Sequence, residues 1–470
     1  MRRHIIFPLI VTAGIGMLLL QACNKLLTVP ANAAGQIVTS QVFSDSANAT
    51  QGILGLYTSL TLTNGWYQDI YAGLGADELL NTSANNSVTV AYYRDSLFVG
   101  SSIVASTSAN FWDPYYNSNC IYLANAALEG LAADSLLSAS ARNQLVGECK
   151  FMRAFYYFYL VNRFGDVPYV TSTNYLVNQR LPRTPASTVY NNMEQDMLQA
   201  RQLMQPAYPS AGRLRPNRYT ADALLARLYL YTQQWSNAET RCDSILNSGL
   251  YALVSNLDNV FLDQSQEAIL QLGNASTSYP KIAPFSGTPF APIFSFLAPA
   301  YSLSPYLIQA FDSGDLRKAH WVGASNVGGI SYSYPYKYKN SVFSNPHNTT
   351  EDLMVFRLAE IYLIRAEARA QQGNLAGAMQ DINVIRSRAG LGAATAGDLP
   401  TAMGVILHER QTELFTEWGH RWLDLKRTDS INAVLGREKP WWPADGHAAL
   451  YPIPYTDLLY NPNLTQNPGY

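Results

Sequence analysis

The amino-acid sequence predicts a mainly α-helical fold: a scaffold of tetratricopeptide-like helical hairpins with long irregular loop insertions that carry short strands. Two observations support this fold class. Segments 223–246 and 360–390 have the character of tetratricopeptide hairpins. Segments near 62–112 and 252–349 are instead rich in Asn, Ser, Gly, Pro and aromatic residues and lack a helical period. We expect the hairpins to form the scaffold and the two insertions to project from it.

Small residues stand where the paired helices of each hairpin must touch. Ala226 and Ala238 lie twelve residues apart in the first hairpin, and Ala366 and Ala378 repeat this spacing in the second, with Gly373 at the turn. Alanine lets two helices approach closely, so the matching spacing strengthens the prediction of two similar hairpins.

Four further helices are expected along the chain. They span residues 46–60, 116–131, 139–164 and 188–204. The third carries apolar residues on one stripe and tyrosines on its other sides, which predicts a helix surrounded by neighbours. Gly165 suits the C-terminal position of this helix, and Pro168 blocks its continuation.

An acidic segment near the C-terminal end, residues 408–429, places three carboxylates at helical spacing. Glu409, Glu413 and Glu417 should share one helix face, and Gly419 permits a tight turn after them. Side chains on one face point the same way, so they cannot easily flank a sugar from both sides as a glycosidase requires.

The acidic segment is therefore interpreted as structural, with its carboxylates pairing with basic residues such as Arg410 and Arg421. Hydrolase, zinc-protease, nucleotide-loop and dinucleotide motifs are absent from the sequence. His408 and His420 are too far apart on a helix to bind one metal. We expect no catalytic residue, no metal site and no cofactor.

Composition excludes one further class of function. The formal net charge of −2 and the pI near 6.3 offer no basic surface, so nucleic-acid binding is not expected. No linker or charge run divides the chain, and one large domain is expected from residue 23 to residue 470. Cys120, Cys149 and Cys242 form no CxxC pair, and Cys242 should act as a small hydrophobic residue on a helix.

The N-terminus has the pattern of a lipoprotein signal peptide. Arg2 and Arg3 precede an apolar run, which ends in Leu-Gln-Ala before Cys23. The run is about 16 residues long, short of the roughly 20 that a membrane span needs. Residues 1–22 should be removed, and Cys23 should become the lipidated first residue.

Three segments resemble the SusD/RagB family of outer-membrane lipoproteins, which capture nutrients, usually glycans. The acidic segment resembles the family pattern ERxxEL…EGxRWxDLxR. RAFYYFYLVNRFGDVPYV, residues 153–170, resembles a second family block, and YPIPYTDLLYNPNLTQNPGY, residues 451–470, resembles the third. The resemblance implies a surface protein, lipid-anchored in the outer membrane, that delivers oligosaccharide to a SusC-like TonB-dependent transporter. It also implies that the insertions form the ligand-binding face.

Both insertions offer the side chains that a glycan site needs. Rings pack against the C–H faces of a sugar, and amides bind its hydroxyls. The candidate ligand-binding residues are Trp66, Tyr67, Asn81, Tyr92, Tyr93, Trp112, Tyr332 and Tyr334. Alternate tyrosines from 332 to 338 also fit a strand, in which case those rings would line one sheet face. Asp77 and Glu78 resemble an acidic pair of the family, with an expected role in local structure.

Two alternatives to glycan capture remain open. The helical repeats could hold a peptide or a protein in their groove, since some members of the resembling family take peptides. A surface glycoside hydrolase would need acids from separate elements to converge in one pocket, and nothing in the sequence indicates this convergence.

Overall fold

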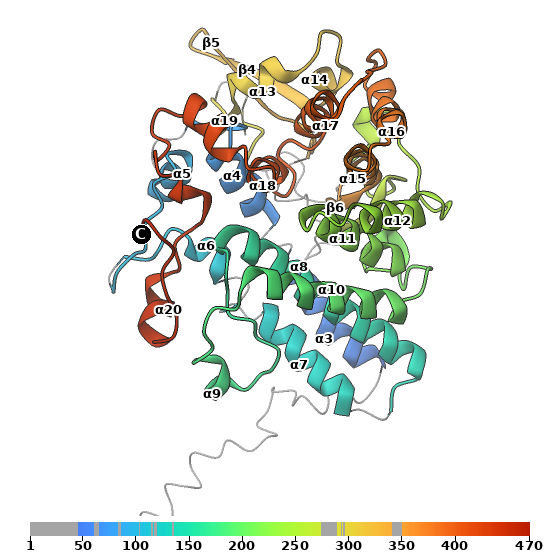
Figure 1. Ribbon diagram of the computed structural model, residues 1–470, viewed down its shortest axis with the longest axis vertical. Coiled ribbons are helices and arrows are strands. Elements are labelled where there is room, and N and C mark those ends of the chain that lie inside the picture. The colour runs from blue at the N-terminus through green and yellow to red at the C-terminus, as the bar shows by residue number, and fades with distance from the viewer. Residues whose placement is uncertain are drawn as a thin grey trace, which may run out of the picture.

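The computed structural model describes residues 46–60, 65–82, 86–102, 104–113, 116, 120–133, 136–273, 289–292, 294, 297–340 and 350–470 (Figure 1). The expected signal peptide and Cys23 lie outside these residues. The side chain of Trp66 is likewise not described.

A succession of helices forms the scaffold. They are α3 (Ser46–Ser59), α7 (Cys120–Ala133), α8 (Ala139–Phe164), α10 (Ala186–Leu203), α11 (Arg218–Tyr231), α12 (Trp235–Leu246), α15 (Leu358–Gln371), α16 (Leu375–Arg388) and α17 (Leu399–Glu413). Neighbours in this order pack side by side, from α7 against α8 to α15 against α16 and α17. Figure 1 shows the stack running from α3 and α7 at one end to α16 and α17 at the other. The mainly helical fold predicted from the sequence is confirmed.

The predicted helices are found close to their expected bounds. Helix α8 spans the predicted residues 139–164, and every residue from Phe151 to Phe164 is buried. Gly165 follows it with a φ of 71° and donates its N–H to Val161 O, as a helix end requires. The surrounded helix inferred from the tyrosines is thus the central helix of the scaffold.

Both hairpins form as predicted, α11 with α12 and α15 with α16. Ala226, Ala238, Ala366 and Ala378 are all fully buried. Gly373 lies at the second turn with a φ of 84°, a conformation that favours glycine. Helix α12 also packs on α15, so the two hairpins form one continuous stack although more than one hundred residues separate them.

The first insertion contains more regular structure than expected. Its elements are α4 (Gly65–Gly75), β1 (Leu79–Asn81), α5 (Ser87–Tyr93) and α6 (Ala109–Trp112). Helix α4 forms because Ile70 and Leu74, four residues apart, are both fully buried. Asn86 caps α5 by accepting hydrogen bonds from the N–H groups of Val88 and Thr89. The expectation of an irregular segment was wrong here because burial and capping stabilise short helices.

The second insertion carries the expected short strands. It contains η3 (Leu257–Asn259), β2 (Ala268–Leu272), β3 (Tyr301–Leu303), α13 (Pro305–Ala310), α14 (Leu316–Trp321), β4 (Val322–Val327) and β5 (Ile330–Pro335). The remaining elements are α9 (Tyr175–Asn178), η2 (Ala211–Arg213), β6 (Leu353–Arg357), α18 (His420–Arg427), α19 (Ile431–Glu438), η5 (His447–Ala449) and α20 (Tyr455–Tyr460).

Within the described residues, the strands form three antiparallel pairs. They are β1 with β3, β2 with β6, and β4 with β5. The first pair joins the two insertions, with Asn81 opposite Tyr301 and Leu79 opposite Leu303. Strand β3 also lies beside β5, so β1, β3 and β5 gather parts of both insertions in one region. Within the described part of the chain, no helix is both long and apolar enough to span a membrane.

Candidate functional site

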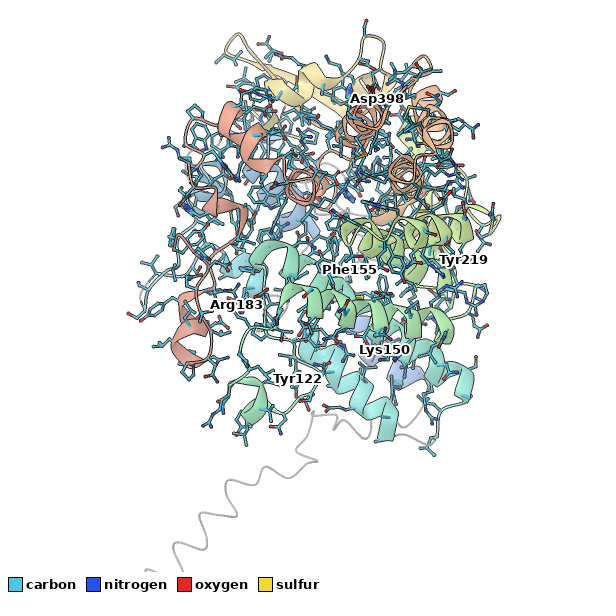
Figure 2. The ribbon with its side chains drawn as sticks, in the orientation of Figure 1. Tyr122, Lys150, Phe155, Arg183, Tyr219 and Asp398 are labelled. Carbon is cyan, nitrogen blue, oxygen red and sulfur yellow. The ribbon has the colours of Figure 1, made fainter. Side chains whose placement is uncertain are left out.

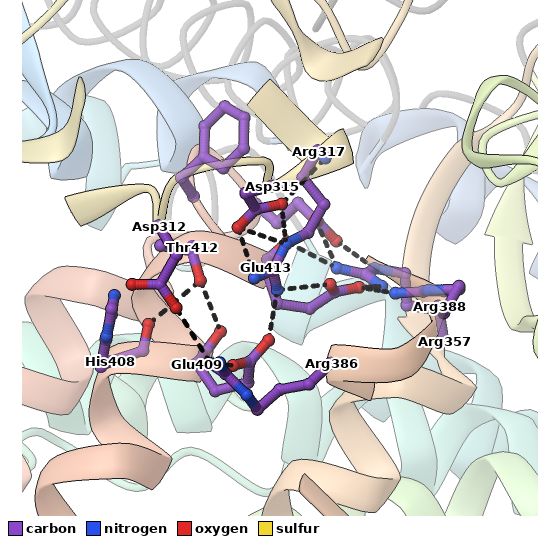
Figure 3. Close-up of polar contacts among 12 residues, drawn as sticks. Asp312, Asp315, Arg317, Arg357, Arg386, Arg388, His408, Glu409, Thr412 and Glu413 are labelled. Carbon is purple, nitrogen blue, oxygen red and sulfur yellow. Dashed lines mark hydrogen bonds and ion pairs between the residues drawn. The ribbon is translucent and has the colours of Figure 1, made fainter. Parts of the chain in front are cut away.

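The acidic segment forms a buried cluster of ion pairs. Arg317 Nη1 lies 2.6 Å from Glu409 Oε1 and 3.1 Å from Glu413 Oε2. Figure 3 shows Glu413 between Arg317, Arg357 and Arg388. These five side chains are at most 4% exposed, and each carboxylate lies next to at least two cations. The structural interpretation of the segment is confirmed.

The expected basic partners of this cluster were wrong. Arg410 pairs with Asp424, at 2.7 Å, and Arg421 pairs with Asp77. Helix α17 ends at Glu413, so Glu417 lies in the following turn and not on the same helix face. The cations come from other elements, which helical spacing cannot reveal.

Charge within this cluster shifts the titration of its carboxylates. Burial acts to raise the pKa of Glu413, but Arg388, Arg357 and Arg317 outweigh it and hold the pKa well below its usual value. Burial also acts against ionisation of Glu417, whose pKa Arg357 and Lys337 hold below the usual value. Both carboxylates are therefore held ionised inside the protein.

The acidic pair in the first insertion is structural as well. Arg421 donates from Nε and Nη2 to the two Asp77 oxygens, at 2.7 and 2.6 Å. Glu78 Oε1 accepts the N–H of Thr416 at 3.3 Å. Burial, and then the charge of Asp77, raise the pKa of Glu78 to about 8. The expected role of this pair in local structure is confirmed by these contacts.

Stacked tyrosine rings lie where the two insertions meet. Tyr67 stacks on Tyr71 with ring centroids 5.1 Å apart, and Tyr71 stacks on Tyr92 at 4.4 Å. Burial raises the pKa of Tyr71, and the nearby phenols of Tyr67 and Tyr301 raise it further. Phe290 packs edge-on to Tyr301 at 6.4 Å. Tyr67 and Tyr301 are both half-buried, so each retains an accessible part.

Asn81 supplies a polar group beside these rings. It lies opposite Tyr301 in the β1–β3 pair, and its Nδ2 donates to Thr89 Oγ1 at 3.2 Å. Its Oδ1 accepts no hydrogen bond from any residue within the described ranges. A buried polar atom is normally paired, so the Asn81 amide oxygen is suited to accept a hydrogen bond from a ligand. We call Tyr67, Tyr71, Asn81, Phe290 and Tyr301 the aromatic shelf.

The neighbouring tyrosines of α5 point in different directions. Tyr92 is buried and donates its hydroxyl to Thr107 O at 2.9 Å, so it supports the ring of Tyr71 from the core side. Tyr93 is half-buried and packs against Trp441 with centroids 5.1 Å apart. Consecutive helix residues diverge in this way because each is rotated by about 100°.

The other expected ligand-binding residues lie around the shelf or behind it. Tyr332 and Tyr334 are half-buried on β5, which lies beside β3, and both extend from the same sheet face. Trp112 is buried, with its ring 4.9 Å from that of Phe164 and 4.7 Å from that of Tyr116. The structure thus gathers Tyr67, Asn81 and β5 in one region and places Trp112 behind it.

Three shelf residues were not among those expected from the sequence. Tyr71 lies four residues after Tyr67 on α4, a spacing that could have revealed it. Tyr301 and Phe290 reach the shelf through the pairing of β3 with β1, for which the sequence carries no signal. Among the described residues, no group of three or more His, Cys, Asp or Glu could hold a metal ion.

The fold and this region define a helical-repeat protein whose insertions present an aromatic shelf. Residues 61–230 match a family model described as "Starch-binding associating with outer membrane", and residues 304–470 match the model of the SusD family. The chain belongs to the SusD/RagB family.

Individual relatives match different shares of the chain. SusD-like protein P25 of Formosa agariphila is 25% identical, over 92% of this chain and 93% of its own. The starch-binding protein SusD of Bacteroides thetaiotaomicron is 32% identical, over 25% of this chain and 22% of its own.

Solved structures share the fold. A SusD superfamily protein from Bacteroides vulgatus superposes with a TM-score of 0.77 at 21% identity, covering 91% of this chain and all of its own. A laminarin-binding SusD-like protein gives a TM-score of 0.74 at 22% identity, covering 90% of this chain and 99% of its own. The names of these relatives describe binding proteins or SusD-like proteins, and none names an enzyme activity.

Proposed function

We propose that this protein is a cell-surface lipoprotein that captures an oligosaccharide on the aromatic shelf. One observation carries the proposal: the half-buried ring of Tyr67 stacks on Tyr71, close to Tyr301 and to the unpaired Oδ1 of Asn81. Relatives described as starch-binding and laminarin-binding support the class of ligand.

The shelf suits capture without chemistry. A pyranose presents C–H groups on its faces and hydroxyls at its edge, so it packs on a phenol ring while a hydroxyl donates to an amide oxygen. Tyr71 stacks on the Tyr67 ring from behind and is itself backed by Tyr92. The Tyr67 side chain is therefore already held in place, and binding costs less side-chain conformational entropy. The carboxylates closest in sequence, Asp69, Asp77 and Glu78, are all buried. Asp69 accepts the N–H of Trp418 and Asp77 is ion-paired with Arg421, so none of the three flanks a sugar on the shelf.

We test the proposal with laminarihexaose and maltohexaose, measured by isothermal titration calorimetry on the chain from Asn24 onward. Tyr67→Ala should weaken binding about tenfold or more, because packing of one aromatic side chain contributes about 1.5 to 3 kcal/mol. The matched control is Tyr219→Ala, which removes another half-buried tyrosine, on α11 in the scaffold (Figure 2). Equal affinity of wild type and Tyr67→Ala would exclude the shelf as the binding site.

Release of reducing ends is measured in the same samples. Binding without release supports a capture protein, whereas release that depends on the bound oligosaccharide would support the glycoside hydrolase alternative. Binding to no glycan, together with retention of peptides, would support the peptide-binding alternative.

The capture protein would be one domain from residue 23 to residue 470, lipid-anchored through Cys23 in the outer membrane. It would deliver its ligand to a SusC-like TonB-dependent transporter. The description of one matching family model as associating with the outer membrane supports this location. Co-purification of such a transporter with the tagged protein from detergent-solubilised outer membranes tests the partnership, and its absence after crosslinking would contradict it.

A further inference from the structure

A cavity opens on a part of the molecule away from the aromatic shelf. It has a volume of about 500 Å³ and lies between α7, the segment after α8 and the C-terminal helix α20. Its size falls within the range of about 300 to 1,000 Å³ that is typical of small-ligand sites. None of the five residues of the aromatic shelf lines it.

The side chain of Trp112 lines this cavity and has an unpaired donor. The residue is 1% exposed, and its indole N–H makes no hydrogen bond to any residue within the described ranges. A buried donor without a partner costs free energy, and each such group in a native protein calls for an explanation. An acceptor atom of a ligand in this cavity could satisfy it.

Fixed rings hold the indole in place. Tyr116 packs against it with centroids 4.7 Å apart, and Tyr116 is itself oriented by donating its hydroxyl to Pro168 O at 2.6 Å. Phe164 packs edge-on from the core at 4.9 Å. The wall of the cavity is therefore formed before any ligand arrives.

Exposed tyrosines from three separate elements surround the same cavity. Tyr122 on α7 is 47% exposed, Tyr175 on α9 is 70% exposed and Tyr460 on α20 is 77% exposed. Figure 2 shows Tyr122 on the lower helix α7, beside the segment that carries α9. Such amphipathic rings at one opening are typical of a surface that meets a partly apolar ligand.

Polar side chains complete the lining. Thr173, Asn178, Gln179, Thr456 and Asp457 contribute to it. Asn178 donates from Nδ2 to Ser172 O at 2.8 Å, which fixes its amide at the rim. Rings for C–H faces, with amides, hydroxyls and a carboxylate for the sugar hydroxyls, are the combination that a carbohydrate needs.

We propose that this cavity is a second carbohydrate site, which holds one or two sugar units with a ring oxygen or hydroxyl accepting from Trp112 Nε1. The class of ligand rests on the glycan binding proposed above, but the location does not. Helix α6 links the two regions, because Phe111 packs edge-on to Tyr71 of the shelf at 5.8 Å while Trp112 lines the cavity.

The test uses NMR spectroscopy of the chain from Asn24 onward, labelled with ¹⁵N in its tryptophans. It follows the resonances of the indole N–H groups. The chain has 8 tryptophans, and Trp112→Phe assigns the signal of interest. Maltose and laminaribiose are the probes, each added to the wild type and to a shelf variant, Tyr67→Ala with Asn81→Ala. We expect either disaccharide to shift the Trp112 signal downfield in both proteins with the same saturation curve.

Affinity variants give a second readout in the shelf-variant background. Trp112→Phe keeps a ring but removes the donor, and it should weaken disaccharide binding about three- to tenfold, as expected for one hydrogen bond. Tyr175→Ala, at an exposed position, should weaken it without affecting folding. Trp441→Phe, which alters a tryptophan outside both sites, should leave it unchanged.

The outcomes separate the two proposals. A Trp112 signal that no disaccharide shifts, while hexasaccharides bind and Tyr67→Ala abolishes their binding, overturns the second site and leaves the shelf intact. Disaccharide binding that persists unchanged in Tyr175→Ala and Trp112→Phe also overturns it. A shift of Trp112 in the shelf variant supports it even if the shelf itself binds nothing.

Discussion

The guanidinium of Arg357 joins two buried carboxylates, donating from Nη1 to Glu413 Oε1 at 2.5 Å and from Nε to Glu417 Oε2 at 2.7 Å. It thereby connects the end of β6 to the turn that leads into α18. Loss of one carboxylate would leave a buried cation without its full set of partners, which is much more costly than loss of an exposed pair.

Glu413→Gln should therefore lower the free energy of unfolding by about 3 to 5 kcal/mol, because it leaves Arg357, Arg388 and Arg317 facing a neutral amide. Urea denaturation followed by circular dichroism measures the change. Glu239→Gln is the matched control, since Glu239 pairs with Arg369 at 2.8 Å in a partly exposed setting, where about 1 kcal/mol or less is expected. Equal losses in the two variants would contradict a special role for the cluster.

Glu78→Gln should change the pH dependence of stability in a defined direction. The pKa of Glu78 is raised to about 8 in the folded protein, from an ordinary value of 4.5, so the folded state retains a proton that the unfolded state releases. The contribution of this group to stability is present below pH 4.5 and is lost as the pH rises towards 8. The free energy of unfolding of the wild type minus that of Glu78→Gln, measured by urea denaturation, should thus fall between pH 5 and pH 8. A difference that rises over this range would refute the assignment.

Gly419→Ala tests the turn between α17 and α18. Gly419 has a φ of 71°, and a Cβ there would lie 2.7 Å from Ala72 Cβ. Both the backbone conformation and the close approach disfavour a side chain, so we expect a loss of about 1 to 3 kcal/mol in unfolding free energy. Thermal melts of both variants measure this loss. Gly392→Ala is the control, because no atom lies within 4 Å of the added Cβ, and it should be close to neutral.

Cys23→Ser should abolish attachment to the outer membrane, because the expected lipid would have no thiol to modify. Membrane fractionation with metabolic labelling by a palmitate analogue measures both attachment and acylation. Cys120→Ser is the control. Cys120 is buried and should carry no lipid, so this variant should be labelled and attached as the wild type is. Unchanged acylation of Cys23→Ser would exclude the signal-peptide interpretation.

The scaffold could be predicted from the sequence because its signals are local. Alanine spacing in the two hairpins and the apolar stripe of α8 depend only on neighbours within a few turns, and the structure confirms them. The short helices α4 and α5 were missed because their stability comes from burial against distant segments and from one cap at Asn86. Local periodicity is weak in helices of this length.

The candidate site was predictable only in part, for the same reason. Tyr67 and Asn81 were selected because rings and amides occur together in one insertion, and both lie in the shelf. Tyr301 could not be selected, since only the pairing of β3 with β1 brings it opposite Asn81. Likewise, the basic partners of Glu413 lie on β6, α14 and α16, at positions that no helical spacing connects.

The pairing of β1 with β3 also constrains how the protein reaches its final form. The two strands are more than two hundred residues apart, and closing so large a loop is entropically unfavourable until much of the scaffold has formed. The shelf should thus be among the last regions to assemble, after the hairpins. A chain emerging from the export machinery would remain unable to bind ligand until its second insertion had followed. Ligand binding would therefore begin only when most of the chain has been exported and folded.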